Sequence, residues 1–299
     1  MALKAVFNAM KREGYIIKDL DLYLLGLNAT DEDRAIDVNA PSQAGTCMRA
    51  RYYARTGAPR DGASIDARTR RIFDNGTKTH ERLQEYLLKQ GMLLMDEVPV
   101  HNYDYNIQGH TDGVLKLSAS ERGILEIKSI NSNGFSNLKG AKEEHRKQGL
   151  IYVFCFESRR QFLQATYKTR AAFDKSLPKR MREYAKLYQH LKDGRKFTRQ
   201  EKIDFQCNLH AQMDSILYDT RVPITKAVFL YENKDTQDLK EFTVSSLEAA
   251  SKTILAEVLE EYATLNECVE EGTIPERCSR SKSDSACRWC NFKTNCWVV

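Results

Sequence analysis

Four cysteines stand within the last 22 residues of this 299-residue chain, at Cys278, Cys287, Cys290 and Cys296. Cys287 and Cys290 are separated by only two residues, and thiolates at such short spacings are typical of metal ligands. Four thiolates are enough for a self-contained tetrahedral zinc site. The tail therefore predicts a thiolate metal site.

A second group of candidate residues lies upstream, where Asp112 precedes the triplet Glu126-Ile127-Lys128. Alternation along a strand puts Glu126 and Lys128 on one face and turns Ile127 to the other. A preceding antiparallel strand could place the Asp112 carboxylate beside Glu126, and two close carboxylates repel unless a cation lies between them.

Mg²⁺ suits such a pair because it prefers oxygen ligands and keeps waters that can attack a phosphodiester. Lys128 could orient that water or stabilise the charge that develops on phosphorus. The pattern predicts a carboxylate metal site, and the alternative interpretation is an exposed cross-strand ion pair.

Periodicity predicts the elements that must position these groups. Helices are expected over residues 42–56, 68–89, 141–156 and 246–271, and strands over 92–101, 105–117, 123–130, 226–232 and 239–244. The first three strands read as a β-meander that carries Asp112 and Glu126. His80 falls on the second helix, while Gln148 and Tyr152, four residues apart, share one face of the third. Residues 157–222 are expected to be mostly helical.

Composition indicates a soluble protein, with 41% hydrophobic and 29% charged residues. No apolar run reaches the roughly 18–20 residues of a membrane helix. Leu3, Val6 and Phe7 show helical spacing rather than the pattern of a secretory leader. A cytoplasmic protein is expected, in which the clustered cysteines bind metal, Cys155 lies in the core, and Cys207 and Cys268 have a structural role only.

The net charge of +5 is too small to indicate nucleic acid by itself, but it is unevenly distributed. Residues 157–222 hold 15 basic and 8 acidic side chains, a net +7, which leaves −2 for the rest of the chain. Tyr184, Tyr188 and Phe197 are interleaved with these cations and could stack on unpaired bases. The alternative is a solvated helical face. The candidate phosphate contacts are Arg49, Arg51, Lys179, Arg180, Arg182, Arg195, Lys196 and Arg199.

Taken in order, these motifs resemble the RecB-like branch of the PD-(D/E)XK nucleases. More narrowly, the chain is similar to the iron-sulfur members of that branch, which include CRISPR adaptation nucleases, the AddB nuclease domain and phage-encoded exonucleases. The likeness extends from about residue 42 to residue 296. Its motifs are Cys47, Gly76-x-x-x-His80, Gly109-His110-Thr111-Asp112, Glu126-Ile127-Lys128, Gln148-x-x-x-Tyr152 and the closing cysteines.

The resemblance implies a role for each matching residue. His80, Asp112, Glu126 and the backbone carbonyl of Ile127 would bind Mg²⁺ or Mn²⁺, and Lys128 would be the catalytic lysine. Gln148 and Tyr152 would position the DNA or this lysine. The chain departs from the family name at Thr111, where proline would be expected, and residues 157–222 read as an insertion.

For the cysteines, the resemblance implies a structural [4Fe-4S] cluster held by Cys47, Cys287, Cys290 and Cys296, with Cys278 as an alternate ligand. A zinc site within the tail and free thiols remain the alternatives. The expected fold is one α/β domain over residues 1–299. It would have a restriction-endonuclease-like mixed sheet flanked by helices, a basic helical insertion at 157–222 and a tail at 272–299 that closes on Cys47.

The expected function is a Mg²⁺- or Mn²⁺-dependent exonuclease that hydrolyses single-stranded or end-exposed DNA. It would act in the cytoplasm, or in the host cytoplasm if phage-encoded, with recombination or replication proteins as further partners. One alternative is a nuclease-inactive DNA-binding or scaffolding subunit. Another is an iron-sulfur redox protein, which is disfavoured because no Gly-rich nucleotide-binding turn follows a predicted strand.

Overall fold

The computed structural model describes residues 10, 14–27, 37–61, 65–194, 196–220, 222–279, 281–288 and 290–298. The helical spacing expected at Leu3, Val6 and Phe7 lies outside these ranges. Among the described helices, none is both long and apolar enough to cross a membrane.

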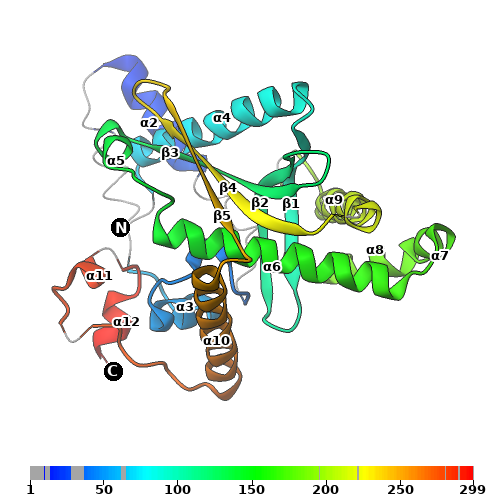
Figure 1. Cartoon of the computed structure of the whole chain (residues 1–299). Coiled ribbons are helices and arrows are strands. Elements are labelled where there is room, and N and C mark those ends of the chain that lie inside the picture. Colours follow the sequence, from blue (N-terminus) through cyan, green and yellow to red (C-terminus); the bar gives the residue numbers. More distant parts are fainter. Residues whose placement is uncertain are drawn as a thin grey trace.

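Five strands form one mixed sheet in the order β1-β2-β3-β4-β5 (Figure 1). The strands are β1 (Leu93–Asn102), β2 (Ile107–Lys116), β3 (Arg122–Ile130), β4 (Ile224–Asn233) and β5 (Leu239–Ser245). The predicted meander is confirmed, because β1, β2 and β3 pair antiparallel. Strand β4 then pairs parallel with β3 and antiparallel with β5. A parallel neighbour needs a crossover, so the chain between β3 and β4 returns through helices.

Helices cover both faces of the sheet. On one face α4 closes a small apolar core built on Leu83, Leu125 and Ile127. On the other, α6, α9 and α10 enclose the main core. The predicted class, α/β with a mixed central sheet flanked by helices and a cysteine-rich tail, is confirmed. The main helices are α2 (Tyr15–Leu27), α3 (Met48–Arg55), α4 (Ala67–Lys89), α6 (Glu143–Thr166), α9 (Arg199–Asp219) and α10 (Ala249–Glu271); the shorter ones are α5 (Ser132–Ser136), α7 (Arg170–Lys175), α8 (Leu177–Leu187), α11 (Ser285–Arg288) and α12 (Lys293–Val298).

Helix α6 approaches the sheet most tightly at Gly149. A Cβ on this glycine would lie 2.5 Å from Phe229 Cζ and 2.8 Å from Ala227 Cβ, so only glycine fits between helix and strand. This close approach brings the neighbouring side chains of α6, Gln148 and Tyr152, within reach of β2 and β3.

The helix predicted over 42–56 is shorter than expected. A 3₁₀ turn covers Pro41–Gln43, and α3 begins only at Met48. Between them Gly45 adopts a φ of +75°, a left-handed conformation that interrupts a helix. Cys47 becomes the N-cap of α3 without a capping side-chain hydrogen bond. The thiol is therefore not engaged in capping.

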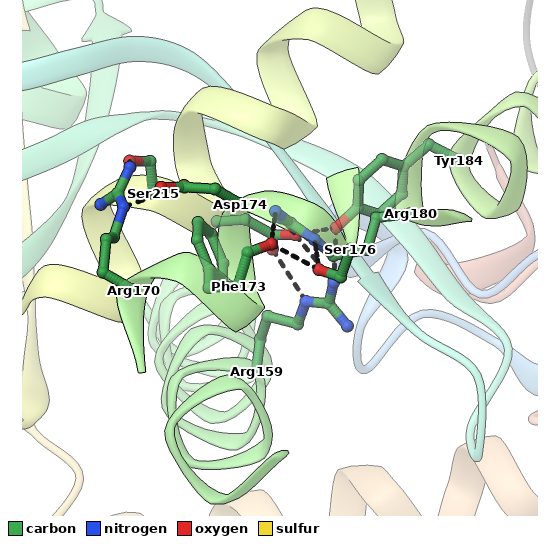
Figure 2. Close-up of polar contacts among 9 residues, drawn as sticks. Arg159, Arg170, Phe173, Asp174, Ser176, Arg180, Tyr184 and Ser215 are labelled. Atoms are coloured by element: carbon green, nitrogen blue, oxygen red, sulfur yellow. Dashed lines mark hydrogen bonds and ion pairs between the residues drawn. The ribbon is translucent and has the colours of Figure 1, made fainter. Parts of the chain in front are cut away.

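The basic segment 157–222 is mostly helical, as predicted, and a carboxylate is buried within it. Asp214 is fully buried on α9 and accepts bonds from Arg159 and Arg180, at 2.9 Å and 2.6 Å, and from the Tyr184 hydroxyl. Figure 2 shows Arg159, Arg180 and Tyr184 converging on this point. Burial acts to raise the pKa of Asp214, but its arginine and tyrosine partners outweigh burial and lower the pKa.

Replacing Asp214 with Ala should destabilise the protein by about 3–5 kcal/mol, because two arginines would be left buried without their counter-charge. Urea denaturation would measure the loss. The matched control is Asp219→Ala on the same helix, where the carboxylate is exposed and bonded to Arg170, and it should cost less than about 1 kcal/mol. Equal midpoints for the two variants would show that the buried cluster does not stabilise the protein.

Candidate active site and cysteine cavity

Strands β2 and β3 separate where the candidate carboxylates lie. The regular backbone pairing of β2 with β3 stops at Gly113 and Leu125. Beyond this pair, hydrogen bonds between side chains and backbone join the two strands. Thr111 Oγ1 donates to the Leu125 carbonyl at 2.8 Å, and the Ile127 amide donates to Asp112 Oδ2 at 2.6 Å. In a strand, the carbonyl of a residue points to the same edge as its amide. Asp112 therefore lies at the edge of β3 to which the Ile127 carbonyl points.

Helix α4 supplies two contacts to Asp112. His80 Nδ1 lies 3.0 Å from Asp112 Oδ1, and Gln84 Nε2 donates to the Asp112 backbone carbonyl at 2.8 Å. Burial acts to lower the pKa of His80, but the adjacent Asp112 outweighs burial and raises the pKa. The two contacts fix both the side chain and the main chain of Asp112.

Lys128 is held by a chain of hydrogen bonds that begins on α6. Tyr152 donates its hydroxyl to the His110 carbonyl at 2.7 Å, so the same oxygen is free to accept from Gln148 Nε2, at 3.1 Å. The amide oxygen of Gln148 then faces Lys128 Nζ at 3.2 Å, and Glu126 Oε2 accepts from the same nitrogen at 2.7 Å. Because an ammonium group has three donors, one remains for a substrate.

Tyr152→Phe should lower the rate of the DNA hydrolysis in which Lys128 is expected to act. Without the hydroxyl, the Gln148 amide loses the bond that orients it, and losing one such bond costs about 1 kcal/mol, or roughly fivefold to tenfold in rate. Initial rates of DNA hydrolysis would measure this. Tyr103→Phe, at an exposed tyrosine, is the control and should leave the rate unchanged. A Tyr152→Phe rate equal to wild type would exclude this orienting role.

Glu126 carries the most perturbed carboxylate of this group. It is 2% exposed, and burial, followed by the charge of Asp112, raises its pKa despite the bond from Lys128. A buried carboxylate beside a second carboxylate is stabilised by a cation. The pair Asp112 and Glu126 therefore fits a hard divalent ion.

Within the described residues, no group of three or more His, Cys, Asp or Glu side chains is close enough together to hold a metal ion. Mg²⁺ does not require such a group, because it is commonly bound by one or two carboxylates with waters and substrate phosphates completing the shell. The two carboxylates and the Ile127 carbonyl are thus compatible with Mg²⁺ or Mn²⁺, with His80 beside them.

Two residues near the site have no counterpart in the sequence prediction. Gln84 is buried and also donates to Glu97 Oε1 at 3.0 Å, so it ties α4 to β1 and β2. His145 bonds the Tyr231 hydroxyl at 2.7 Å, and burial and then Lys128 lower its pKa to about 4. It stands three residues before Gln148 and seven before Tyr152, a helical spacing that could have indicated a shared face.

Three of the predicted phosphate contacts are buried and therefore wrong. Arg49, Arg51 and Arg180 are 8%, 4% and 2% exposed. Arg51 pairs with Glu261 on α10 at 2.6 Å, and Arg180 pairs with Asp214.

The remaining candidates divide by exposure. Tyr184 and Tyr188 are buried in an apolar cluster within residues 157–222, so they are not available to stack on bases. Arg195 lies outside the described residues. The exposed members are Lys179, Arg182, Lys196, Phe197 and Arg199.

All of the predicted cysteine ligands line one cavity, between the start of α3 and the C-terminal tail. They are Cys47, Cys278, Cys287, Cys290 and Cys296. Cys278 is exposed as a residue, but partial desolvation of its thiol, and then the neighbouring thiol of Cys47, raise its pKa. The structure thus brings Cys47 to the tail from about 230 residues away, and its contact with Cys278 places the alternate ligand at the same cavity. Among the described residues these thiols are not gathered closely enough to form a metal-binding group, although thiolates are the ligands that both zinc and iron-sulfur clusters take.

No protein-family model matches the chain, and no curated protein matches it. Among solved structures it is similar to the crystal structure of SSO0001, at 14% identity and a TM-score of 0.45, over 95% of this chain and 98% of that one. It is also similar to an alkaline exonuclease (LHK-Exo) from Laribacter hongkongensis, at 13% identity and a TM-score of 0.43, over 79% of this chain and 92% of that one. Likenesses of this strength carry no argument about activity, so the chemistry is derived from the site.

Proposed function

We propose that this protein is a Mg²⁺- or Mn²⁺-dependent deoxyribonuclease that hydrolyses DNA from free or single-stranded ends. One observation carries the proposal: Lys128 is fixed between Glu126 and Gln148, at 2.7 Å and 3.2 Å, beside a second carboxylate at Asp112. An ion pair formed only for stability would not need the chain of bonds through Gln148 and Tyr152. That chain holds one ammonium group in one orientation.

The residues divide the work of hydrolysis among them. Asp112, Glu126 and the Ile127 carbonyl would hold a divalent ion, which supplies a water of lowered pKa and offsets charge on the phosphate. Lys128 directs its free donor at the scissile phosphate, where negative charge grows as water oxygen bonds to phosphorus and the P–O bond to the leaving nucleotide breaks. The leaving oxygen takes up a proton, so the products are a phosphate end and a hydroxyl end.

The sequence predicts His80 as a metal ligand, whereas in this scheme it has a positioning role. Its Nδ1 bonds Asp112 Oδ1, while Asp112 Oδ2 accepts a hydrogen bond from the Ile127 amide. The two bonds together fix the plane of the carboxylate. A carboxylate held at both oxygens presents one geometry to an ion, and preorganisation of this kind supports metal affinity. Gln84 acts in the same direction through the main chain of Asp112.

The five-cysteine cavity is proposed to hold a structural [4Fe-4S] cluster through Cys47, Cys287, Cys290 and Cys296, with Cys278 as the alternate ligand. This would tie the start of α3 to the tail and so close the chain on itself. The aromatic and apolar cluster around the cavity, which includes Tyr53 and Phe292, already packs these two segments together. Its role would be to hold the fold, because the hydrolysis described above transfers no electrons.

DNA hydrolysis by the purified protein, with Mg²⁺ and with excess chelator, tests the proposal. A nuclease-inactive DNA-binding subunit is the alternative, and it would bind DNA under both conditions without shortening it. The arrangement at Lys128 favours the nuclease.

A further inference from the structure

A groove of about 700 Å³ runs from the candidate active site along α4. His80, Ile127 and Lys128 line its inner end, so the groove is continuous with the residues proposed to act on phosphate. Its outer end is lined by Phe73, a phenylalanine that is 54% exposed.

The groove is positively charged. Arg68, Arg71, Lys128 and Lys234 line it, against one carboxylate, Asp235. Arg71 is paired with Asp21 at 2.5 Å. Outside the proposed catalytic group, the cations best placed to attract the phosphates of a bound strand are therefore Arg68 and Lys234. A polyanion is therefore the ligand whose charge complements this surface.

Gly76 lies on the floor of the groove, in the middle of α4, and nothing in the packing explains it. Its φ is not positive, and a Cβ added there would meet no atom within 4 Å. Glycine is among the poorest residues in a helix interior, so a glycine without a packing role is a cost to α4. The open space above Gly76 is the groove itself. A side chain at this position would intrude on whatever the groove holds.

Phe73, Gly76 and His80 share one face of α4, because they are spaced by three and four residues. Seven residues of helix place Phe73 about 10 Å from His80 along the axis. At about 3.4 Å per stacked nucleotide, this distance corresponds to roughly three nucleotides. A strand whose phosphate lies beside His80, at the end of the groove that Lys128 also lines, would thus present a base to the ring of Phe73 after it crosses Gly76.

We infer that this groove is a track for single-stranded DNA, in which Phe73 stacks on a base about three nucleotides from the scissile phosphate and Gly76 keeps the path open. The inference rests on the proposed nuclease function and adds to it the residues that would recognise an unpaired strand. Base pairs inside a duplex are stacked on both faces and offer none to a side chain, whereas each base of an unpaired strand can offer one. The groove should therefore favour unpaired ends over blunt duplex.

Binding of labelled oligonucleotides in excess chelator tests this without hydrolysis. Phe73→Ala should raise the Kd for a single strand about tenfold, which is about 1.4 kcal/mol, and leave the Kd for a blunt duplex unchanged. Phe205→Ala is the matched control, because Phe205 is an exposed phenylalanine on α9, and it should change neither Kd. Equal single-strand affinity for Phe73→Ala and wild type, or an equal loss on both substrates, would overturn the inference.

Two further measurements separate stacking from a general loss of structure. Oligonucleotides with one abasic position, scanned along the strand, should bind wild type about tenfold more weakly at one position only, and Phe73→Ala should remove that sensitivity. Gly76→Leu should weaken single-strand binding at least tenfold without lowering the Tm, because leucine is the better helix former. A lowered Tm, or unchanged binding, would exclude Gly76 as the open floor of the track. Failure of the nuclease proposal would show separately, as no hydrolysis by wild type in Mg²⁺.

Discussion

Glu126→Gln should reduce the rate of DNA hydrolysis by about a thousandfold or more while the protein remains folded. The substitution keeps the shape of the side chain but removes the negative charge that holds a divalent ion, and the ion contributes several kcal/mol to the transition state. Asp112→Ala should have an effect of the same order, because Asp112 would supply the other carboxylate. Initial rates on a labelled single strand in Mg²⁺ would measure both variants.

Glu121→Gln provides the matched control for this prediction. Glu121 lies in the turn between the same two strands and is exposed, and its carboxylate accepts a hydrogen bond from Lys226 Nζ at 2.6 Å. Its loss should leave the rate within about twofold of wild type. If Glu126→Gln retained the activity of Glu121→Gln, the buried carboxylate would have no part in the chemistry and the site would have to be sought elsewhere.

Cys47→Ser should remove the metal from the tail and lower the Tm by roughly 10 °C or more. A metal site that joins distant segments contributes several kcal/mol to folding, and in a chain of this size each kcal/mol corresponds to a few degrees. Anaerobically purified wild type should be brown, with a broad thiolate-to-iron absorption band, and the variant should be colourless. Metal analysis and thermal unfolding would measure the two effects.

Cys268→Ser controls for the loss of a thiol in the same neighbourhood. Cys268 packs against the aromatic cluster of α3 and the tail but does not line the cavity. It should keep the colour and most of the stability. A colourless wild type with stoichiometric zinc, retained in Cys47→Ser and lost in Cys278→Ser, would replace the proposed cluster with a zinc site confined to the tail.

The sequence was sufficient to predict the hairpin and the faces of its residues. The strand period of two placed Glu126 and Lys128 together, and helical spacing placed Gln148 and Tyr152 on one face of α6, as the structure shows. These arrangements are local, since they depend on residues a few positions apart and on one turn. Their catalytic roles remain proposals.

Long-range partners could not be predicted in the same way. The sequence around Arg51 indicates a surface cation, but in the fold Glu261 of α10, 210 residues later, pairs with it. Arg180 likewise pairs with Asp214, which lies on a different helix. Counting charged residues gives the net charge of a segment, but it does not show which residue each charged side chain contacts in the fold. The contact of Gln84 with Asp112 was missed for the same reason, because it depends on how α4 packs on the sheet.

Hydrolysis of single-stranded DNA by the wild-type protein, with and without Mg²⁺, tests the central claim most directly. We predict that the labelled strand is shortened progressively from an end in Mg²⁺, that excess chelator stops the reaction, and that added Mg²⁺ or Mn²⁺ restores it. Intact DNA after incubation in Mg²⁺ and in Mn²⁺, or hydrolysis that continues in excess chelator, would contradict the account.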